Sequence, residues 1–126
     1  MSLAALWARY NDAFEIRYTD SQKAKTILLS LAEESLPHEL YIRTYILLVS
    51  KTVKSDKMEE YLNFAERMWG AYRAAYALDS LENKTICELS SELWDARDLL
   101  RMARRLDDLD VVIAEERRRA SELPST

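Results

Sequence analysis

Apolar residues recur every three or four positions along most of this 126-residue chain, which is the spacing of one face of an α-helix. The first such segment covers residues 3–18. Its aromatic members are Trp7, Tyr10, Phe14 and Tyr18. Three residues that commonly cap helices follow at positions 19–21, and the apolar pattern then resumes up to Leu31. The pattern therefore predicts two helices joined by a tight turn.

Two further helices are predicted after Pro37. Proline is tolerated in the first turn of a helix, so a third helix is expected over about residues 37–53. The apolar run at 45–49 is also compatible with a strand, but the helical pattern on both sides favours a buried helix. A fourth helix is expected from Asp56 to about Ser80, because Glu59 follows Asp56 at the spacing of a capping box.

The C-terminal segment from Thr85 to Leu123 contains neither glycine nor proline, and Thr85 and Glu88 have capping-box spacing. Its first apolar stripe consists of Ile86, Leu89, Leu93, Ala96, Leu100 and Ala103. A second stripe, seven residues apart, consists of Leu99, Leu106, Ile113 and Ala120. Either one long helix bends here, or Asp107 and Asp108 cap a new helix after Leu106. The break is the favoured interpretation, because it would turn Leu109, Val112 and Ile113 back onto the domain.

Composition supports an all-α fold. The chain has one glycine and two prolines, where average usage would give roughly 15 such residues, and β-sheet turns depend on them. We therefore predict a single helical domain over residues 1–123, with about six helices in three hairpins and a frayed tail at 124–126. Gly70 lies among several alanines in the fourth helix, which suggests close approach of another helix there.

A repeat connects the first two hairpins. Sliding the chain on itself by 34 residues places the turn at 19–21 on residues 53–55. The aligned pairs include Leu6 with Leu40, Trp7 with Tyr41, Arg9 with Arg43 and Leu28 with Leu62. Thirty-four residues of helix-turn-helix is the period of the tetratricopeptide repeat.

Residues 3–69 resemble that family. In the first unit the matching residues are Trp7, Tyr10, Phe14, Ala24, Leu28 and Pro37. The chain departs from the family pattern at Asn11, where the repeat has glycine, and in the third hairpin, which does not keep the register. The resemblance implies a stack of hairpins whose first helices line a concave groove for a peptide or helix of another protein. A plain orthogonal or up-and-down bundle is the alternative architecture.

Candidate binding residues follow from these patterns. On the exposed sides of first helices they are Arg9, Asn11, Arg17 and Arg43. On the fourth helix they are Trp69, Tyr72 and Tyr76, aromatic residues that are also typical of a core. On the fifth helix they belong to a basic stripe of Arg97, Arg101, Arg104 and Arg105. With a net charge of −4, this stripe suggests a solvated face or a site for an acidic partner rather than nucleic-acid binding.

Residues that could carry catalysis are few. His38 is the only histidine, so no multi-histidine metal site is possible, and we expect it on the surface. Glu88, Glu92 and Asp95 share one helix face, and the Glu92–Asp95 spacing resembles half of the Mg²⁺ site of all-helical nucleotide pyrophosphohydrolases. The second half of such a site is missing from the preceding helix. An enzyme of that kind is therefore the alternative, and no cofactor is predicted.

The compartment and partners can be inferred only broadly. Cys87 is the only cysteine, which excludes an internal disulfide and favours a reducing, cytoplasmic location. Glu88 beside it disfavours a thiolate, so we expect Cys87 to be a packed or half-buried, inert thiol. No apolar run has the length of a membrane span. The favoured function is a small helical interaction module that binds another protein or itself and performs no catalysis.

Overall fold

The computed structural model describes residues 2–76 and 81–122 and has no strand among them. Its helices are α1 (Leu3–Glu15), α2 (Ser21–Ala32), α3 (His38–Ser50), α4 (Ser55–Tyr76) and α5 (Asn83–Glu122). The all-α prediction is therefore confirmed. The predicted end of the fourth helix near Ser80 and the tail at 124–126 lie outside the described residues.

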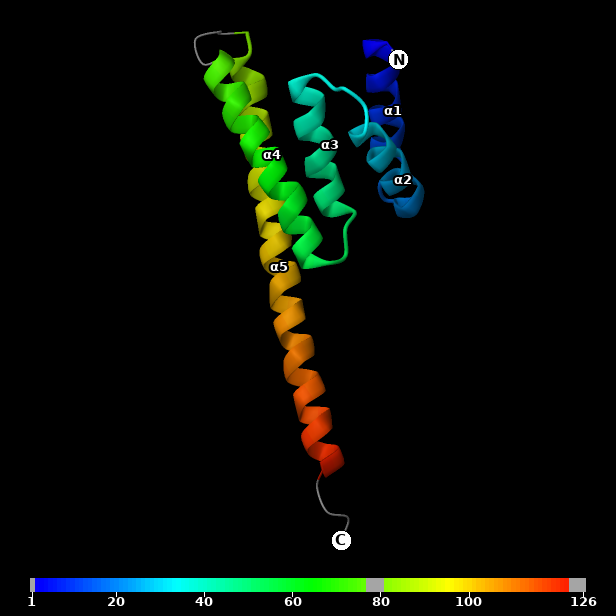
Figure 1. Cartoon of the computed structure of the whole chain (residues 1–126), viewed down its shortest axis with the longest axis vertical. Coiled ribbons are helices and arrows are strands. Elements are labelled where there is room, and N and C mark those ends of the chain that lie inside the picture. Colours follow the sequence, from blue (N-terminus) through cyan, green and yellow to red (C-terminus); the bar gives the residue numbers. More distant parts are fainter. Residues whose placement is uncertain (1, 77–80, 123–126) are drawn as a thin grey trace.

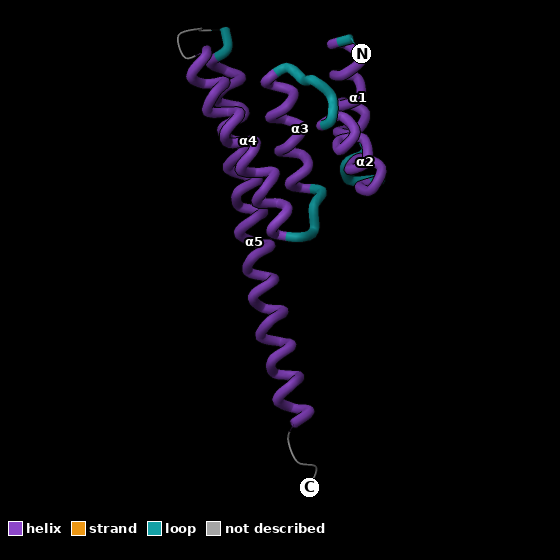
Figure 2. The backbone as a smooth tube through the Cα atoms, in the orientation of Figure 1, coloured by secondary structure: helices purple, strands orange, loops and turns teal. Residues whose placement is uncertain are grey.

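Helix α3 occupies the centre of the molecule, where it contacts each of the other four helices. Helix α2 packs against α1 and α3, while α4 packs against α3 and α5 (Figure 1). Helix α1 also reaches α3 directly, and α3 reaches α5. The upper half of α5 runs beside α4, and its lower half extends alone below the rest of the molecule (Figure 2).

Leucine side chains form most of the core. One cluster joins α1, α2 and α3 around the fully buried Leu28, Leu40 and Leu48. The α5 stripe predicted from the sequence packs into the other two clusters, with Leu89 fully buried against α3 and α4. Each fully buried leucine contributes about 1.5 to 3 kcal/mol of hydrophobic free energy, so this stripe fixes the upper half of α5 on the body.

The helix starts follow local capping chemistry. The Asp20 carboxylate accepts a hydrogen bond from the Lys23 backbone N–H at 3.1 Å, which confirms the predicted turn between the first two helices. Pro37 directly precedes α3, as its backbone geometry favours. Helix α5 begins at Asn83, two residues before Thr85, so the capping box predicted at Thr85 lies inside the helix rather than at its start.

The predicted break after Leu106 is wrong, because α5 is one continuous helix that replaces the two helices expected there. Asp107 does not cap a new helix. Its carboxylate accepts a hydrogen bond from the Ser55 hydroxyl at 2.6 Å, at the point where α5 leaves the body. A segment without glycine or proline keeps its helical hydrogen bonds. As a result Leu109, Val112 and Ile113 do not face the domain; they are exposed.

Two smaller expectations are also wrong. Gly70 is exposed, and a Cβ atom built on it would meet no neighbouring atom within 4 Å, so none of the described helices approaches it closely. Its neighbours Ala71 and Ala74 are exposed as well. The α4 residues that pack with α5 lie on another face of the helix and include Leu62 and Ala65. Cys87 is exposed rather than packed, because it lies opposite the buried stripe of α5. His38 is exposed, as expected.

Candidate functional site

A groove lies where α1, α3 and the upper half of α5 come together, and it encloses about 510 Å³. Its apolar lining consists of Tyr10, Phe14, Tyr18, Ile46, Leu47, Ala96 and Leu99. Its polar lining consists of Arg17, Arg43, Ser50, Lys51, Glu92 and Asp95. This volume and this mostly apolar surface with a few charges are typical of binding sites. We call the space between these residues the groove.

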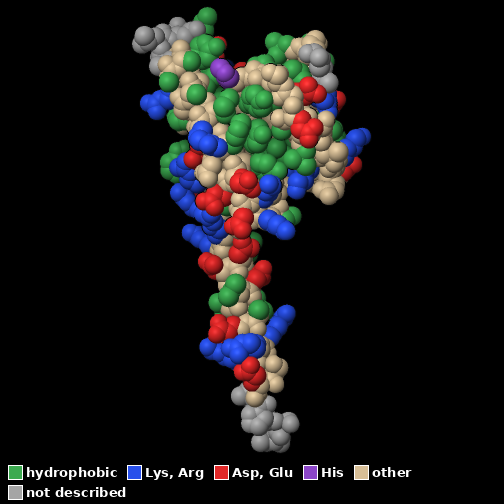
Figure 3. Space-filling model, viewed as in Figure 1, with side chains coloured by type: hydrophobic (Ala, Val, Ile, Leu, Met, Phe, Trp, Pro, Cys, Tyr) green, Lys and Arg blue, Asp and Glu red, His purple; other side chains and the backbone are tan. Residues whose placement is uncertain are grey.

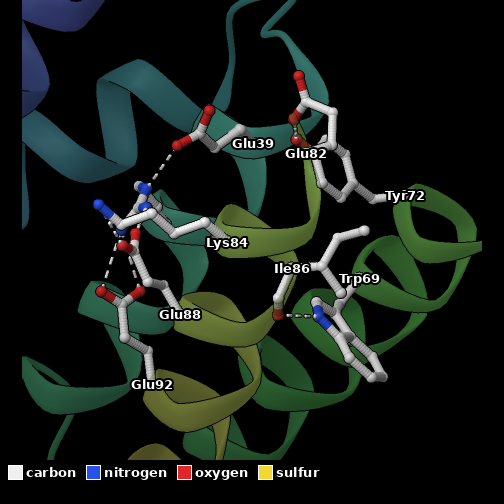
Figure 4. Close-up of polar contacts among 9 residues, drawn as sticks. Glu39, Trp69, Tyr72, Glu82, Lys84, Ile86, Glu88 and Glu92 are labelled. Atoms are coloured by element: carbon white, nitrogen blue, oxygen red, sulfur yellow. Dashed lines mark hydrogen bonds and ion pairs between the residues drawn. The ribbon is translucent and has the colours of Figure 1, made fainter. Parts of the chain in front are cut away.

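An ion-pair network closes one end of the groove. The Arg43 guanidinium donates to Glu39 through Nε at 3.0 Å and to both carboxylate oxygens of Glu92 through Nη1 at 3.0 and 3.2 Å. Glu88 lies 3.5 Å from Nη2. Figure 4 shows Glu39, Glu88 and Glu92 converging from two helices on this single point. This network joins α3 to α5. Because the Arg43 side chain is only 16 % exposed, its ion pairs are shielded from full solvent screening.

Burial raises the pKa of two groups that line the groove, Tyr10 and Glu92. The pKa of Tyr10 is raised to about 12, first by burial and then by the nearby charge of Glu92. Burial also raises the pKa of the Glu92 carboxyl, although Arg43 acts in the opposite direction. The Tyr10 hydroxyl therefore keeps its proton to a higher pH than an exposed tyrosine does.

The other end of the groove carries two cations, Arg17 and Lys51. The Arg17 guanidinium lies 3.6 Å from the centre of the Phe14 ring and donates to the Phe14 carbonyl at 2.5 Å. The Lys51 ammonium donates to the Arg17 carbonyl and lies 5.2 Å from the Tyr18 ring. Within residues 2–76 and 81–122, neither cation pairs with a carboxylate. This end of the groove therefore presents positive charge above an apolar floor.

The candidate binding residues on the first helices of the hairpins lie in different surroundings. Arg43 lies in the groove, but Arg9 donates to the Ser30 hydroxyl on α2 at 2.8 Å and does not line the groove. Asn11 is exposed outside it. The 34-residue offset therefore matches Arg9 and Arg43 in sequence, while the two side chains contact different helices.

The aromatic candidates on α4 belong mainly to the core. The Trp69 indole N–H donates to the Ile86 carbonyl at 3.1 Å, and the Tyr72 hydroxyl donates to Glu82 (Figure 4). Burial and then this hydrogen bond raise the pKa of Tyr72. Tyr76 is exposed beside Tyr72. Trp69 and Tyr72 therefore fasten the start of α5 to α4 and do not form a binding patch.

Most of the basic stripe on α5 takes part in ion pairs. Arg97 pairs with Glu66 and Arg104 with Glu59, both on α4, so these two arginines stabilise the α4–α5 contact. Arg101 pairs with Asp98 one turn earlier at 3.0 Å. The stripe thus acts mainly as a rim of surface ion pairs, each worth about 0 to 1 kcal/mol.

The carboxylates of the alternative metal site are already engaged. Glu88 and Glu92 both bind Arg43, a cation that competes directly with a metal ion. Asp95 is exposed in the groove. Within the part of the chain that the structure describes, no three residues of the metal-binding types are arranged to hold an ion.

The sequence patterns did not single out an aromatic cluster between α3 and α4. It consists of Tyr41, Tyr45, Tyr61 and Phe64, with Tyr45 and Phe64 stacked at 4.3 Å between ring centres. The aromatic pairs at 41/45 and 61/64 have the three- and four-residue spacing of a helix face, which is the signal that could have identified them. All four rings are half-buried, so the cluster mainly stabilises the body.

Comparison with known proteins gives no match to a family model, to a curated protein or to a solved structure. Among the described residues, no helix has both the length and the apolar character needed to cross a lipid bilayer.

Proposed function

We propose that this chain is a protein-interaction module whose groove receives a helical segment of a partner protein. The observation that carries the proposal is the groove itself, which encloses about 510 Å³ over an apolar floor. At one end it carries Arg17 and Lys51, which pair with no carboxylate among the described residues. An occupant with an apolar face and a carboxylate near its end would bury the floor and pair with these cations. The module would therefore dock a partner or assemble as a subunit, without catalysis of its own.

The order of helix contacts agrees with a tetratricopeptide-like stack. In such a stack the first helix of each hairpin lines the concave side, and the groove here is lined by α1, α3 and α5. Within this proposal α1–α2 and α3–α4 are two repeat units, and α5 is a long final helix. The lone Cys87 thiol, which is exposed, fits a reducing compartment such as the cytoplasm.

A display library of random amphipathic helices, selected on the purified protein, tests this function. Selected helices should bind with micromolar or better affinity in fluorescence anisotropy. Phe14→Glu should weaken binding at least tenfold, because it places a carboxylate in the apolar groove. Leu29→Glu is the matched control, since Leu29 is 39 % exposed on α2 and Phe14 is 42 % exposed. Helices that bind both variants as well as the parent chain would contradict the proposal.

A further inference from the structure

The projecting half of α5, residues 104–122, is exposed at every position, yet it is not uniformly polar. Apolar residues follow one another at steps of three and four along one side of the helix. The stripe starts just before the projecting half and consists of Leu99, Met102, Leu106, Leu109 and Ile113, between 39 % and 59 % exposed; we call these residues the seam. Figure 3 shows apolar side chains between charged bands on this part of the molecule. A single exposed leucine is ordinary, but a continuous stripe marks an interaction site.

The seam has the repeat of a coiled coil. With Leu99 in position a of a heptad, Met102 and Leu109 fall in position d, and Leu106 and Ile113 fall in position a. Five successive core positions are therefore apolar. A lone helix of this length is marginally stable in water, and packing of its apolar face supplies most of a helix's stability. A second helix packed along the seam would supply this stabilisation.

We infer that the seam is covered by the α5 helix of a second copy of this chain, running antiparallel, with its C-terminal end in the groove. This inference rests on the proposed function, because it names the helix that the groove receives. Pairing Leu106 with Leu109 of the other copy sets the register and also places Met102 opposite Ile113. Both pairs occur twice by symmetry.

Charge at the flanks agrees with this register. Asp98 and Arg119 both occupy g positions of the heptad. In the antiparallel register Asp98 of each copy lies opposite Arg119 of the other copy, so this pair occurs twice in the dimer. Glu116 of the second copy falls at the level of Leu99, which lines the groove together with Arg17 and Lys51. Arg17 and Lys51, which have no carboxylate partner within residues 2–76 and 81–122, thereby acquire one.

A parallel pair fits the same residues less well. It would stack Glu116 on Glu116 in a core d position, where two like charges repel. Phe14, near the end of α1, and Tyr18, in the turn after it, line the groove together with Leu99, so this end of α1 overhangs the seam side of α5. In a parallel pair the two overhanging ends would compete for the same space. In an antiparallel pair each overhang covers the free end of the other α5.

Sedimentation equilibrium of the full chain provides the first test. We expect a dimer at micromolar concentration, converted to a monomer by Leu106→Glu. Val111→Glu is the matched control, because Val111 is 65 % exposed on the opposite side of the same helix and should leave the dimer intact. Circular dichroism shows whether each variant remains folded. A parent chain that sediments as a monomer, or a dimer that survives Leu106→Glu, would overturn the inference.

Disulfide trapping in a Cys87→Ser background tests the orientation. Met102→Cys and Ile113→Cys chains, mixed and oxidised, should form a mixed disulfide, because these positions face each other only in the antiparallel register. Each variant oxidised alone should remain largely uncrosslinked. Efficient crosslinking of either variant alone would indicate a parallel pair and overturn the inference.

The two proposals fail separately. The helix-library selection can be repeated on the Leu106→Glu chain, whose groove residues are unchanged and, as a monomer, unoccupied. If the parent chain is monomeric but selected helices still bind in a Phe14-dependent way, the inference is overturned and the proposed function stands. If the chain dimerises in the antiparallel register and Phe14→Glu weakens that dimer, both are supported.

Discussion

The two halves of α5 belong to one continuous helix but lie in opposite environments. In the upper half, residues 83–103, the stripe that includes Leu89 and Leu93 is buried against α3 and α4. In the projecting half, Leu106 and Leu109 are more than half exposed. Both halves contain leucines at helical spacing, so composition does not distinguish them. The difference is that the buried stripe ends near Leu100, while a second stripe that starts at Leu99 continues on another side of the helix past the end of α3 and the start of α4.

This change of sides has a structural consequence. The upper half uses its apolar stripe to complete the core of its own chain, whereas the projecting half presents its stripe on the side of the groove. A helix without glycine or proline carries rigid geometry from one environment into the other. One helix can therefore serve folding at one end and association at the other.

The largest expected effect on stability is at a buried leucine of α5, compared with an exposed leucine of the same helix. Leu89→Ala should destabilise the protein by about 2 to 5 kcal/mol, because it leaves a cavity at a fully buried site. Leu106→Ala should change the stability of the monomer by no more than about 0.5 kcal/mol. Urea unfolding monitored by circular dichroism at nanomolar concentration measures both. Equal losses would show that the projecting half packs on its own chain.

A smaller effect is expected where Arg43 ties α3 to the upper half of α5. Arg43→Met should cost about 1 to 2 kcal/mol at neutral pH, because Glu92 and Glu39 lose their cation while remaining half-buried. Lys84→Met is the control, since Lys84 is 87 % exposed and lies 3.9 Å from Glu88. Chemical denaturation compares the two, and a loss as large for Lys84→Met would contradict the role of the network.

The same variant should respond to pH in a defined direction. Burial raises the pKa of Glu92, and removing Arg43 raises it further, so the folded variant holds this proton more tightly than the unfolded chain. That contribution is fully present below the ordinary carboxyl pKa and is lost as the pH rises through the raised value. The stability deficit of Arg43→Met should therefore shrink on acidification. A deficit that grows at low pH would contradict this sign.

Thr44→Val should stabilise the body by about 1 to 2 kcal/mol. The Thr44 hydroxyl is fully buried in α3 and is without a hydrogen-bond partner among the described residues, which is a net cost to folding. Valine has a similar shape and removes that cost. Thr26→Val is the control, because the exposed Thr26 hydroxyl donates to the Gln22 carbonyl at 3.0 Å. Thermal unfolding should show a higher midpoint for Thr44→Val only.

The smallest effect concerns the outer face of α4. Gly70→Ala should stabilise the protein by about 0.8 kcal/mol, since alanine favours the helix and its Cβ meets no neighbouring atom. The reverse change at the exposed Ala71, Ala71→Gly, should cost a similar amount. A loss of stability in Gly70→Ala would mean that another element does approach this face.

Local sequence patterns were sufficient for much of the fold. A helix cap within residues 19–21 and the buried stripe through Leu93 depend on neighbours three or four residues away, and both are predicted by the sequence; the structure identifies Asp20 as the cap. The break at Asp107 was wrong, because the partner of Asp107 is Ser55, 52 residues away, rather than a local backbone N–H. Gly70 was misread for a related reason: a small residue permits a close approach but does not require one.

The candidate site was harder to predict than the helices. Arg43 was identified as a candidate, but its contact with Glu88 and Glu92 spans 45 and 49 residues and depends on the packing of α3 against α5. The pairing of Lys51 with the Arg17 carbonyl likewise appears only when α1 and α3 are placed side by side. Charges on separate helices have no fixed spacing in sequence, so their convergence follows from tertiary structure alone.

Hydrogen exchange of the two halves of α5, followed as the protein is diluted, measures the proposed association directly. Amides of residues 104–122 should be protected at micromolar concentration and lose that protection on dilution to nanomolar concentration or in Leu106→Glu. Amides around Leu89 should stay protected throughout, because the body holds them. Exchange of residues 104–122 that is the same at every concentration and in Leu106→Glu would show that no second helix covers the seam.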